Sequence, residues 1–193
     1  YKRQEKINVL SLAKQHSCGK TIVAGVGTNS LEHTIANIKL LEPHGVDVFL
    51  VVVPYYNKPP QEGMFQYFKA VAASTSKPVL LYNVPGRTGV NMTAETTLRL
   101  ANDFENIVAI KEASGNIAQM DEIIKNKPEG FDVISGDDGI TFPLITLGAV
   151  GVISVLGNAF PREFSRMTQL ALEGDYVNAL PIHHQFAEMC NLL

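Results

Sequence analysis

The chain has 193 residues, of which 46% are hydrophobic and 18% are charged, and its formal net charge is −3 at pH 7. This length suits one core, so we expect a single domain over residues 1–193. The negative balance offers no basic surface for nucleic acid, and the longest apolar run, residues 46–54, is too short to cross a membrane. The two cysteines, Cys18 and Cys190, form no metal or redox motif, which favours a reducing cytoplasm.

Helical and strand patterns alternate along the chain from its first residues. Ile7, Leu10 and Ala13 recur at helical spacing within residues 1–17, and a β-branched run ending in glycine follows at 21–27. We expect further strands at 46–54, 78–84, 107–113, 131–136 and 151–155, and further helices at 31–41, 61–74, 93–102, 116–125, 140–147, 161–173 and 176–193. The first of these further strands is apolar on both faces, as in a parallel sheet covered by helices.

This strict alternation predicts parallel βα units with right-handed crossovers, in either an open doubly wound sheet or a (β/α)8 TIM barrel. Polar side chains follow nearly every predicted strand: Asn29, Tyr55, Tyr56, Tyr82, Asn83, Lys111, Glu112, Asp137, Asp138 and Ser154. A barrel gathers functional groups from all its strand ends, whereas an open sheet concentrates them at one switch point. We therefore predict a barrel. A full barrel has eight strands in about 250 residues, so this chain supplies about six of its βα units.

Lys111 lies near the end of the apolar strand 107–113. A buried ammonium is costly unless it is paired or reactive, and desolvation lowers the pKa of a lysine. The neutral amine is the form that attacks carbonyl groups. The sequence therefore suggests a Schiff-base lysine, the alternative being a solvated strand end.

The stretch YNVPGRTG, residues 82–89, places Tyr82 at a strand end and Arg87 in a loop shaped by proline and glycine. An arginine held in this way suits bidentate binding of a carboxylate, although a lone arginine is commonly a surface charge. In a barrel, Tyr82 and Lys111 would project from neighbouring strands. A phenol beside an amine can relay protons as an imine forms.

A tyrosine pair, Tyr55 and Tyr56, follows the strand 46–54 on a proline-rich loop. The pair can cap the core or fill an interface, or it can donate and relay protons. GVGTN, residues 25–29, lacks the third glycine of a dinucleotide fingerprint, so we expect its glycines to permit a sharp turn.

SGDDG, residues 135–139, raises the question of a metal site. The five histidines lie outside the predicted strand ends, so we predict no metal ligands. We expect Asp137 or Asp138 to cap the next helix instead.

Taken together, the stretches YYNKPPQEG, YNVPGRTG, IKEASGN, SGDD and GVISV resemble the dihydrodipicolinate synthase family, in order and at compatible spacing over essentially the whole chain. The resemblance implies a TIM barrel of the pyruvate-dependent aldolase superfamily. It also implies a lyase that condenses pyruvate with L-aspartate-4-semialdehyde to give 4-hydroxy-tetrahydrodipicolinate, in lysine and diaminopimelate biosynthesis. The family needs no cofactor and forms homodimers or homotetramers.

The same resemblance implies roles for particular residues. Lys111 would form the imine with pyruvate, and Tyr82 would hydrogen-bond the pyruvate and shuttle protons. Tyr56 would cross a dimer interface into the partner's site and complete the proton relay. Arg87 would bind the carboxylate of aspartate semialdehyde.

Backbone groups of Gly136 and Ile153 would line the pyruvate pocket. Three further residues match the region where lysine-inhibited members bind lysine: Asn29, Tyr55 and His33. His33 stands where those members carry an acidic residue, so the resemblance does not by itself imply lysine sensitivity.

The family's GTTGE loop is absent from the chain, and we expect it to lie, with two strands, before Tyr1, while further helices would follow Leu193. Two alternatives stay open. The first is a related pyruvate aldolase, such as N-acetylneuraminate lyase or a 2-keto-3-deoxy sugar acid aldolase, which would not need Arg87 for a semialdehyde carboxylate. The second is a non-catalytic barrel used for binding.

Overall fold

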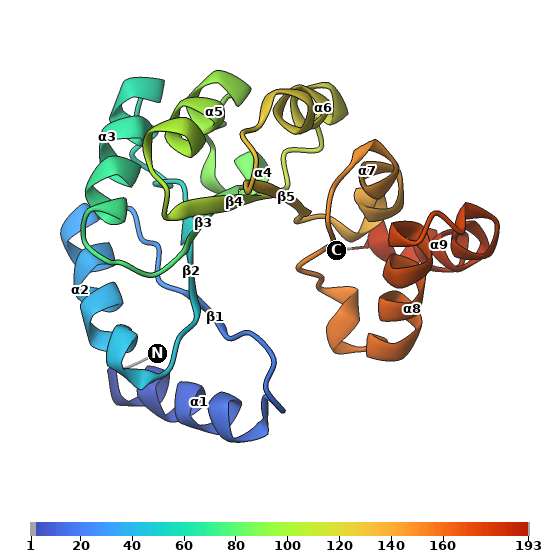
Figure 1. The fold of residues 1–193 in the computed structure, drawn as a ribbon, viewed down its shortest axis with the longest axis horizontal. Helices are drawn as coiled ribbons and strands as arrows, with labels where there is room; N and C mark the ends of the chain where they lie inside the picture. Colours follow the sequence, from blue (N-terminus) through green and yellow to red (C-terminus); the bar gives the residue numbers. More distant parts are fainter. Residues whose placement is uncertain (1–2, 193) are drawn as a thin grey trace.

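The computed structural model describes residues 3–192, and its centre is a five-stranded parallel sheet. The strands lie in chain order: β1 (Val23–Gly25), β2 (Val48–Val52), β3 (Val79–Asn83), β4 (Ile107–Glu112) and β5 (Asp132–Ser135). Four connecting helices follow them in turn: α2 (Leu31–Leu41), α3 (Gln61–Ala72), α5 (Ala94–Asp103) and α6 (Ile117–Asn126). These helices all lie on the outer side of a curved sheet (Figure 1). One-sided covering of a sequentially ordered parallel sheet is the arrangement of a barrel, not of a doubly wound sheet.

The remaining helices flank this arc. They are α1 (Arg3–His16), α4 (Pro85–Thr88), α7 (Thr141–Leu147), α8 (Pro161–Leu172) and α9 (Tyr176–Cys190), with 3-10 turns at Glu42–His44, Asp138–Ile140 and Leu156–Asn158. Apart from the strand at 151–155, the predicted helices and strands are observed, with ends shifted by one or two residues in most cases. The parts of the predictions that fall on residues 1, 2 and 193 lie outside the described residues. No helix within residues 3–192 is long and apolar enough to span a membrane.

The sixth predicted strand, residues 151–155, is replaced by a single bridge. Val152 pairs with Ser135 in an isolated parallel bridge, with Ile153 N–H donating to Ser135 O at 3.0 Å. The run cannot extend because the Asp138 carboxylate accepts hydrogen bonds from the backbone N–H groups of Val155 (3.0 Å) and Leu156 (2.8 Å). These bonds turn the chain into a 3-10 turn where a strand would continue. The expectation of six strands is therefore wrong by one.

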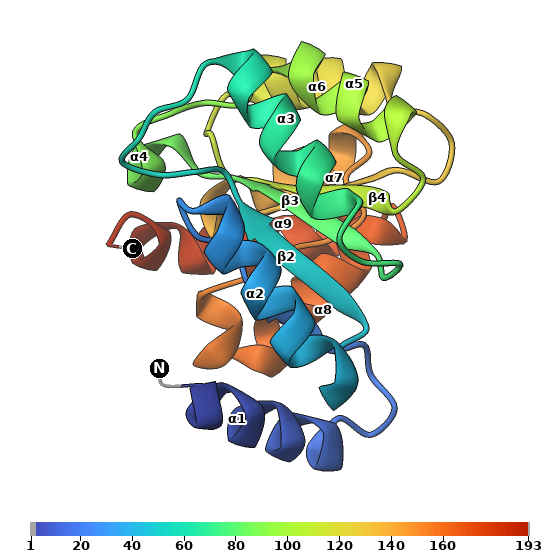
Figure 2. The same ribbon diagram turned by 90° about the vertical axis from the view of Figure 1, so that its left-hand side faces the viewer.

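The main core lies between the sheet and its outer helices. On β2, Phe49 and Val51 are fully buried, whereas Leu50 and Val52 are half-buried and line a cavity on the inner face. Figure 2 shows α2 and α3 covering the outer side of this strand. The alternation explains why the strand is apolar throughout, because one face packs on helices and the other faces the barrel interior.

Of the two glycines at the end of β1, Gly27 serves close packing, and neither serves a left-handed turn. Neither Gly25 nor Gly27 has a positive φ. A Cβ on Gly27 would lie 2.5 Å from the backbone N of Val52, whereas a Cβ on Gly25 would meet no described atom within 4 Å. The expected need for a sharp turn is therefore replaced by a need for space between β1 and β2.

Candidate active site

Two residues predicted to meet do so at the centre of the sheet. Tyr82 on β3 and Lys111 on β4 are paired in the strand register. The Lys111 Nζ atom lies 4.4 Å from the centroid of the Tyr82 ring. Lys111 is 8% exposed, so its amine is held in contact with the phenol and largely away from water. The predicted neighbourhood of these two side chains is confirmed.

The environment shifts both groups toward their uncharged forms. Burial lowers the pKa of Lys111, and the nearby Asp138 carboxylate opposes this shift. Burial raises the pKa of Tyr82, and the charge of Arg87 acts in the opposite direction. A larger fraction of neutral amine favours attack on a carbonyl, while a protonated phenol can donate a proton.

Gly136, which follows β5, leaves room for the lysine. A Cβ at this position would lie 2.8 Å from Ala113 Cβ, 2.9 Å from Lys111 Cε and 3.0 Å from Lys111 Cγ. Its N–H donates to the carbonyl of Glu112 at 2.8 Å, which ties the chain after β5 to the end of β4. The bare backbone therefore packs directly against the side chain of Lys111.

A cavity of about 350 Å³ opens beside this pair. Its lining combines strand ends and loops: Tyr82, Val84, Gly86, Arg87, Ala113, Gly136, Asp137, Asp138, Val155 and Cys190. Lys111 does not line this cavity. Its amine contacts the ring of Tyr82, and Tyr82 does line the cavity. Three predicted site residues, Tyr82, Arg87 and Gly136, thus share one cavity.

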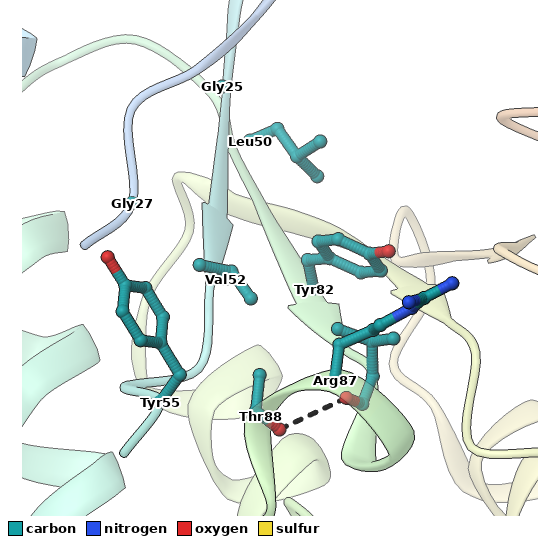
Figure 3. A pocket seen from close by; sticks show the side chains of 9 residues that line it. Gly25, Gly27, Leu50, Val52, Tyr55, Tyr82, Arg87 and Thr88 are labelled. Atoms are coloured by element: carbon teal, nitrogen blue, oxygen red, sulfur yellow. Dashed lines mark hydrogen bonds between the residues drawn. The ribbon is translucent and has the colours of Figure 1, made fainter. Parts of the chain in front are cut away.

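A second cavity, of about 390 Å³, adjoins the first along the inner face of the sheet. Tyr82 and Arg87 line both cavities. Figure 3 shows the Arg87 side chain beside the Tyr82 ring, with its guanidinium toward the hydroxyl end, and Tyr55 on the other side of Val52. An extended ligand reaching from one cavity to the other would pass both residues.

The loop that carries Arg87 contains a short helix that the sequence did not predict. Pro85 occupies the first turn of α4, and Gly89 ends it with φ of +73°. Thr88 Oγ1 donates to Val84 O (3.1 Å; Figure 3) and to Val90 O (2.9 Å). Proline and glycine therefore shape this segment as expected, and Arg87 is presented at its exposed side.

Tyr56 is not part of the cavities that this chain forms around Tyr82. Its side chain is 87% exposed, and its φ of +70° is unusual for a residue with a side chain. Its N–H donates to Thr88 O at 3.4 Å, which connects the tyrosine loop to the Arg87 loop. The structure thus holds a large aromatic side chain out from the surface.

The three residues matched to a lysine site are spread over different hollows. Asn29 Nδ2 donates to Asn57 Oδ1 at 3.2 Å, and Tyr55 lines the cavity of Figure 3. His33 lines a separate hollow together with Asn37. Ile153, by contrast, lies near the site, since its N–H donates to the carbonyl of Ser135, next to Gly136.

The acidic pair after β5 behaves partly as predicted. Asp137 Oδ1 accepts from Gly139 N–H at 2.8 Å and so caps the 3-10 turn Asp138–Ile140 that leads into α7, whereas α7 itself has no side-chain cap. Asp138 is 6% exposed, and within the described chain its Oδ1 has no hydrogen-bond partner. The sequence did not predict that the charge of Asp138 would act on Lys111, and no local pattern indicates it. Within residues 3–192, no three acidic, histidine or cysteine side chains are grouped to hold a metal ion.

Glu112 is the other functional candidate that was not singled out. It is fully buried on the outer side of β4 and is surrounded by hydrogen-bond donors. The sequence did indicate Glu112, because a carboxylate inside a buried strand is almost never found without bonding partners.

The fold and the site define an α/β barrel protein with a buried strand-end lysine held against a tyrosine. The chain belongs to the dihydrodipicolinate synthetase family, whose model matches residues 2–193. It is 66% identical over 192 residues to a 4-hydroxy-tetrahydrodipicolinate synthase of Phocaeicola vulgatus, covering 99% of this chain and 65% of that protein. A similar relative from Parabacteroides distasonis is 63% identical, with 98% and 64% covered. The chain thus spans about 65% of the length of these curated relatives.

Solved structures agree with this assignment and confirm the predicted barrel fold. The crystal structure of dihydrodipicolinate synthase from Aquifex aeolicus superposes with a TM-score of 0.95 at 39% identity, covering all of this chain and 66% of that one. The structure of the chloride-inhibited dihydrodipicolinate synthase from Acinetobacter baumannii, complexed with pyruvate, gives a TM-score of 0.94 at 37% identity, again covering 100% and 66%.

Proposed function

We propose that the protein is a 4-hydroxy-tetrahydrodipicolinate synthase that condenses pyruvate with L-aspartate-4-semialdehyde through an imine on Lys111. The observation that carries the proposal is the buried Lys111 amine, 4.4 Å from the centroid of the Tyr82 ring. The names of the relatives and the pyruvate bound to the A. baumannii protein support the same chemistry. We infer that it acts in the cytoplasm as a homodimer or homotetramer, without a cofactor.

The chemistry follows from the two side chains. The neutral Lys111 amine attacks the ketone carbon of pyruvate, and Tyr82 supplies the proton with which water leaves as the imine forms. The Tyr82 phenolate left by that step takes a methyl proton to give an enamine, and Tyr82 returns the proton to the aldehyde oxygen of the second substrate as the enamine carbon attacks it. The amine of that substrate then displaces Lys111 as the ring closes, so the lysine is regenerated.

Arg87 is the residue that selects the second substrate. Its guanidinium lines both cavities beside Tyr82, so it can receive a carboxylate at the far end of an aldehyde bound near Lys111. Gly136 and Ile153 would contribute backbone groups to the pyruvate pocket. A sugar-acid aldolase would use the same lysine and tyrosine but would not need an arginine at this place.

The test is to incubate the full-length protein with pyruvate, reduce with borohydride, and map the adduct by mass spectrometry. An adduct on Lys111 is expected, and its absence would rule out the mechanism. Turnover of aspartate semialdehyde is then compared with that of sugar aldehydes.

Replacing Arg87 by Ala should raise the KM for aspartate semialdehyde at least tenfold, roughly the loss of one charge-assisted pair. Trapping of pyruvate should not change. Arg99→Ala is the matched control, because Arg99 is an exposed arginine paired with Glu62 at 2.7 Å. Equal effects of the two substitutions would contradict the role of Arg87.

A further inference from the structure

Glu112 is a fully buried carboxylate that faces away from the cavity, because its neighbour Lys111 points inward on the same strand. Three groups donate to it. Asn83 Nδ2 lies 3.2 and 3.1 Å from its two oxygens, Ser114 N lies 2.7 Å from Oε1, and Gln119 Nε2 lies 3.1 Å from Oε2. The carboxylate therefore joins β3, the turn after β4, and helix α6.

The polarity of this site is set by the main chain of Met92. Its N–H donates to Asn83 Oδ1 at 3.0 Å, so the amide group of Asn83 must face Glu112. Its carbonyl accepts from Gln119 Nε2 at 3.1 Å, so that amide is oriented too. Ser114 contributes a backbone N–H, which can only donate. Every hydrogen-bond partner of the Glu112 carboxylate within residues 3–192 is thus a donor, and an acceptor-only carboxylate is the group that satisfies all of them.

The network also anchors the far end of the Arg87 loop. Asn91 accepts from Asn83 Nδ2 at 2.8 Å and donates to Gln119 Oε1 at 2.8 Å. Residues 84–92 are therefore clamped at both ends to side chains that bind Glu112. The same carboxylate holds Ser114, next to Ala113 on the wall of the cavity.

We propose that Glu112 is a positioning residue, kept as an anion, that fixes the Arg87 loop relative to Lys111 and so sets the binding of the semialdehyde carboxylate. The inference rests on the proposed function. Burial raises the pKa of Glu112, and the donated hydrogen bonds oppose this by favouring the carboxylate. Within residues 3–192 Glu112 has no ion-pair partner, and a buried charge without one is costly. An apolar side chain could fill this space without that cost but could not bind the three donors. The cost is therefore consistent with a positioning role for the carboxylate.

The test is Glu112→Gln in the full-length protein. The introduced NH₂ group must face a donor, so the clamp on the Arg87 loop is broken while the shape of the side chain is kept. We expect the KM for aspartate semialdehyde to rise about tenfold, the equivalent of one lost hydrogen bond to a charged group. The KM for pyruvate and the rate of borohydride trapping on Lys111 should change less than about twofold, because the lysine keeps its register with β3.

Two further variants separate positioning from general damage. In Glu112→Gln with Gln119→Glu the carboxylate moves to α6 and can accept from residue 112 and from Asn91, but the Met92 carbonyl loses its donor at position 119. We therefore expect only partial recovery of the KM. Glu62→Gln is the control, because Glu62 is an exposed carboxylate that also accepts from an amide, Gln66 Nε2, at 2.7 Å.

The outcomes are distinguishable. An unchanged KM for the semialdehyde in Glu112→Gln, or equal losses for both substrates, would overturn the positioning role. If Glu112→Gln does not fold, Gln119→Met breaks the same link to Asn91 and must show the selective rise, or the inference fails. A wild-type protein that traps no pyruvate would overturn the proposed function, and this inference with it.

Discussion

Lys111 shows how a single residue is prepared for chemistry at a cost in stability. Its side chain is 8% exposed, the ring of Tyr82 covers its amine, and the bare backbone of Gly136 packs on its methylene groups. These contacts exclude water from an ammonium ion, which therefore loses solvation in the folded state. The same burial that makes the amine reactive makes the folded protein less stable than it would be with an apolar side chain.

Lys111→Met should therefore abolish adduct formation and raise the free energy of unfolding at pH 7 by about 1 kcal/mol. Because burial lowers the pKa of Lys111 below its ordinary value of 10.5, the unfolded chain binds this proton more tightly than the folded protein. As pH rises from the lowered pKa toward 10.5, the free energy of unfolding of the wild-type protein should therefore increase relative to that of the variant. Urea unfolding across this range measures the difference.

Lys125→Met, at an exposed lysine, is the control and should show neither the stabilisation nor this pH dependence. A wild-type protein that is more stable than Lys111→Met at pH 7 would contradict the argument.

At the scale of elements, the inner edge of the sheet depends on how closely β1 and β2 approach. Val26 N–H donates to Leu50 O at 3.0 Å, and one residue later Gly27 packs against the backbone of Val52. Backbone atoms cannot move aside as the end of a flexible side chain can. The glycine is therefore required by the pairing of two strands.

Gly27→Ala should lower the free energy of unfolding by about 2 kcal/mol, because its Cβ would lie 2.5 Å from Val52 N and would force the strands apart. Gly25→Ala, two residues earlier, has open space at its Cβ among the described atoms and should change stability little. Urea denaturation of the two variants side by side makes the comparison. Equal urea midpoints for Gly27→Ala and Gly25→Ala would show that a Cβ at position 27 does not destabilise the protein.

At the scale of the whole molecule, Tyr56 is the feature that a single chain does not explain. Its side chain is 87% exposed and its backbone is held at φ +70°, a conformation that costs free energy for a residue with a side chain. A strained, projecting aromatic residue suits insertion into a second copy of the chain. This agrees with the proposed role of Tyr56 in the partner's site.

Co-expression of Tyr56→Phe with Lys111→Met tests that role. If Tyr56 acts across the interface, a mixed dimer keeps one complete site, and random mixing should restore about a quarter of wild-type turnover. Tyr82→Phe with Lys111→Met is the control, because both residues serve the same subunit's site and no intact site can arise. Recovery in neither mixture would place the function of Tyr56 elsewhere.

The sequence by itself determined the alternation of elements, and the polar residues after the strands then favoured the barrel and the neighbourhood of Tyr82 and Lys111. Hydrophobic periodicity is local, and consecutive parallel strands bring their carboxyl ends to one edge. The turn chemistry of Pro85 and Gly89 is local as well, which is why a shaped loop presenting Arg87 was predictable, although its short helix α4 was not.

Only the tertiary structure decided the features that depend on distant partners. Residues 151–155 have the pattern of a strand, but the Asp138 carboxylate binds N–H groups 17 and 18 residues away and turns the chain. Glu112 acquires its partners from β3, from the turn after β4, and from α6, with Asn83 lying 29 residues earlier. Such hydrogen bonds leave no periodic mark in the sequence, because their geometry exists only once the strands and helices have packed.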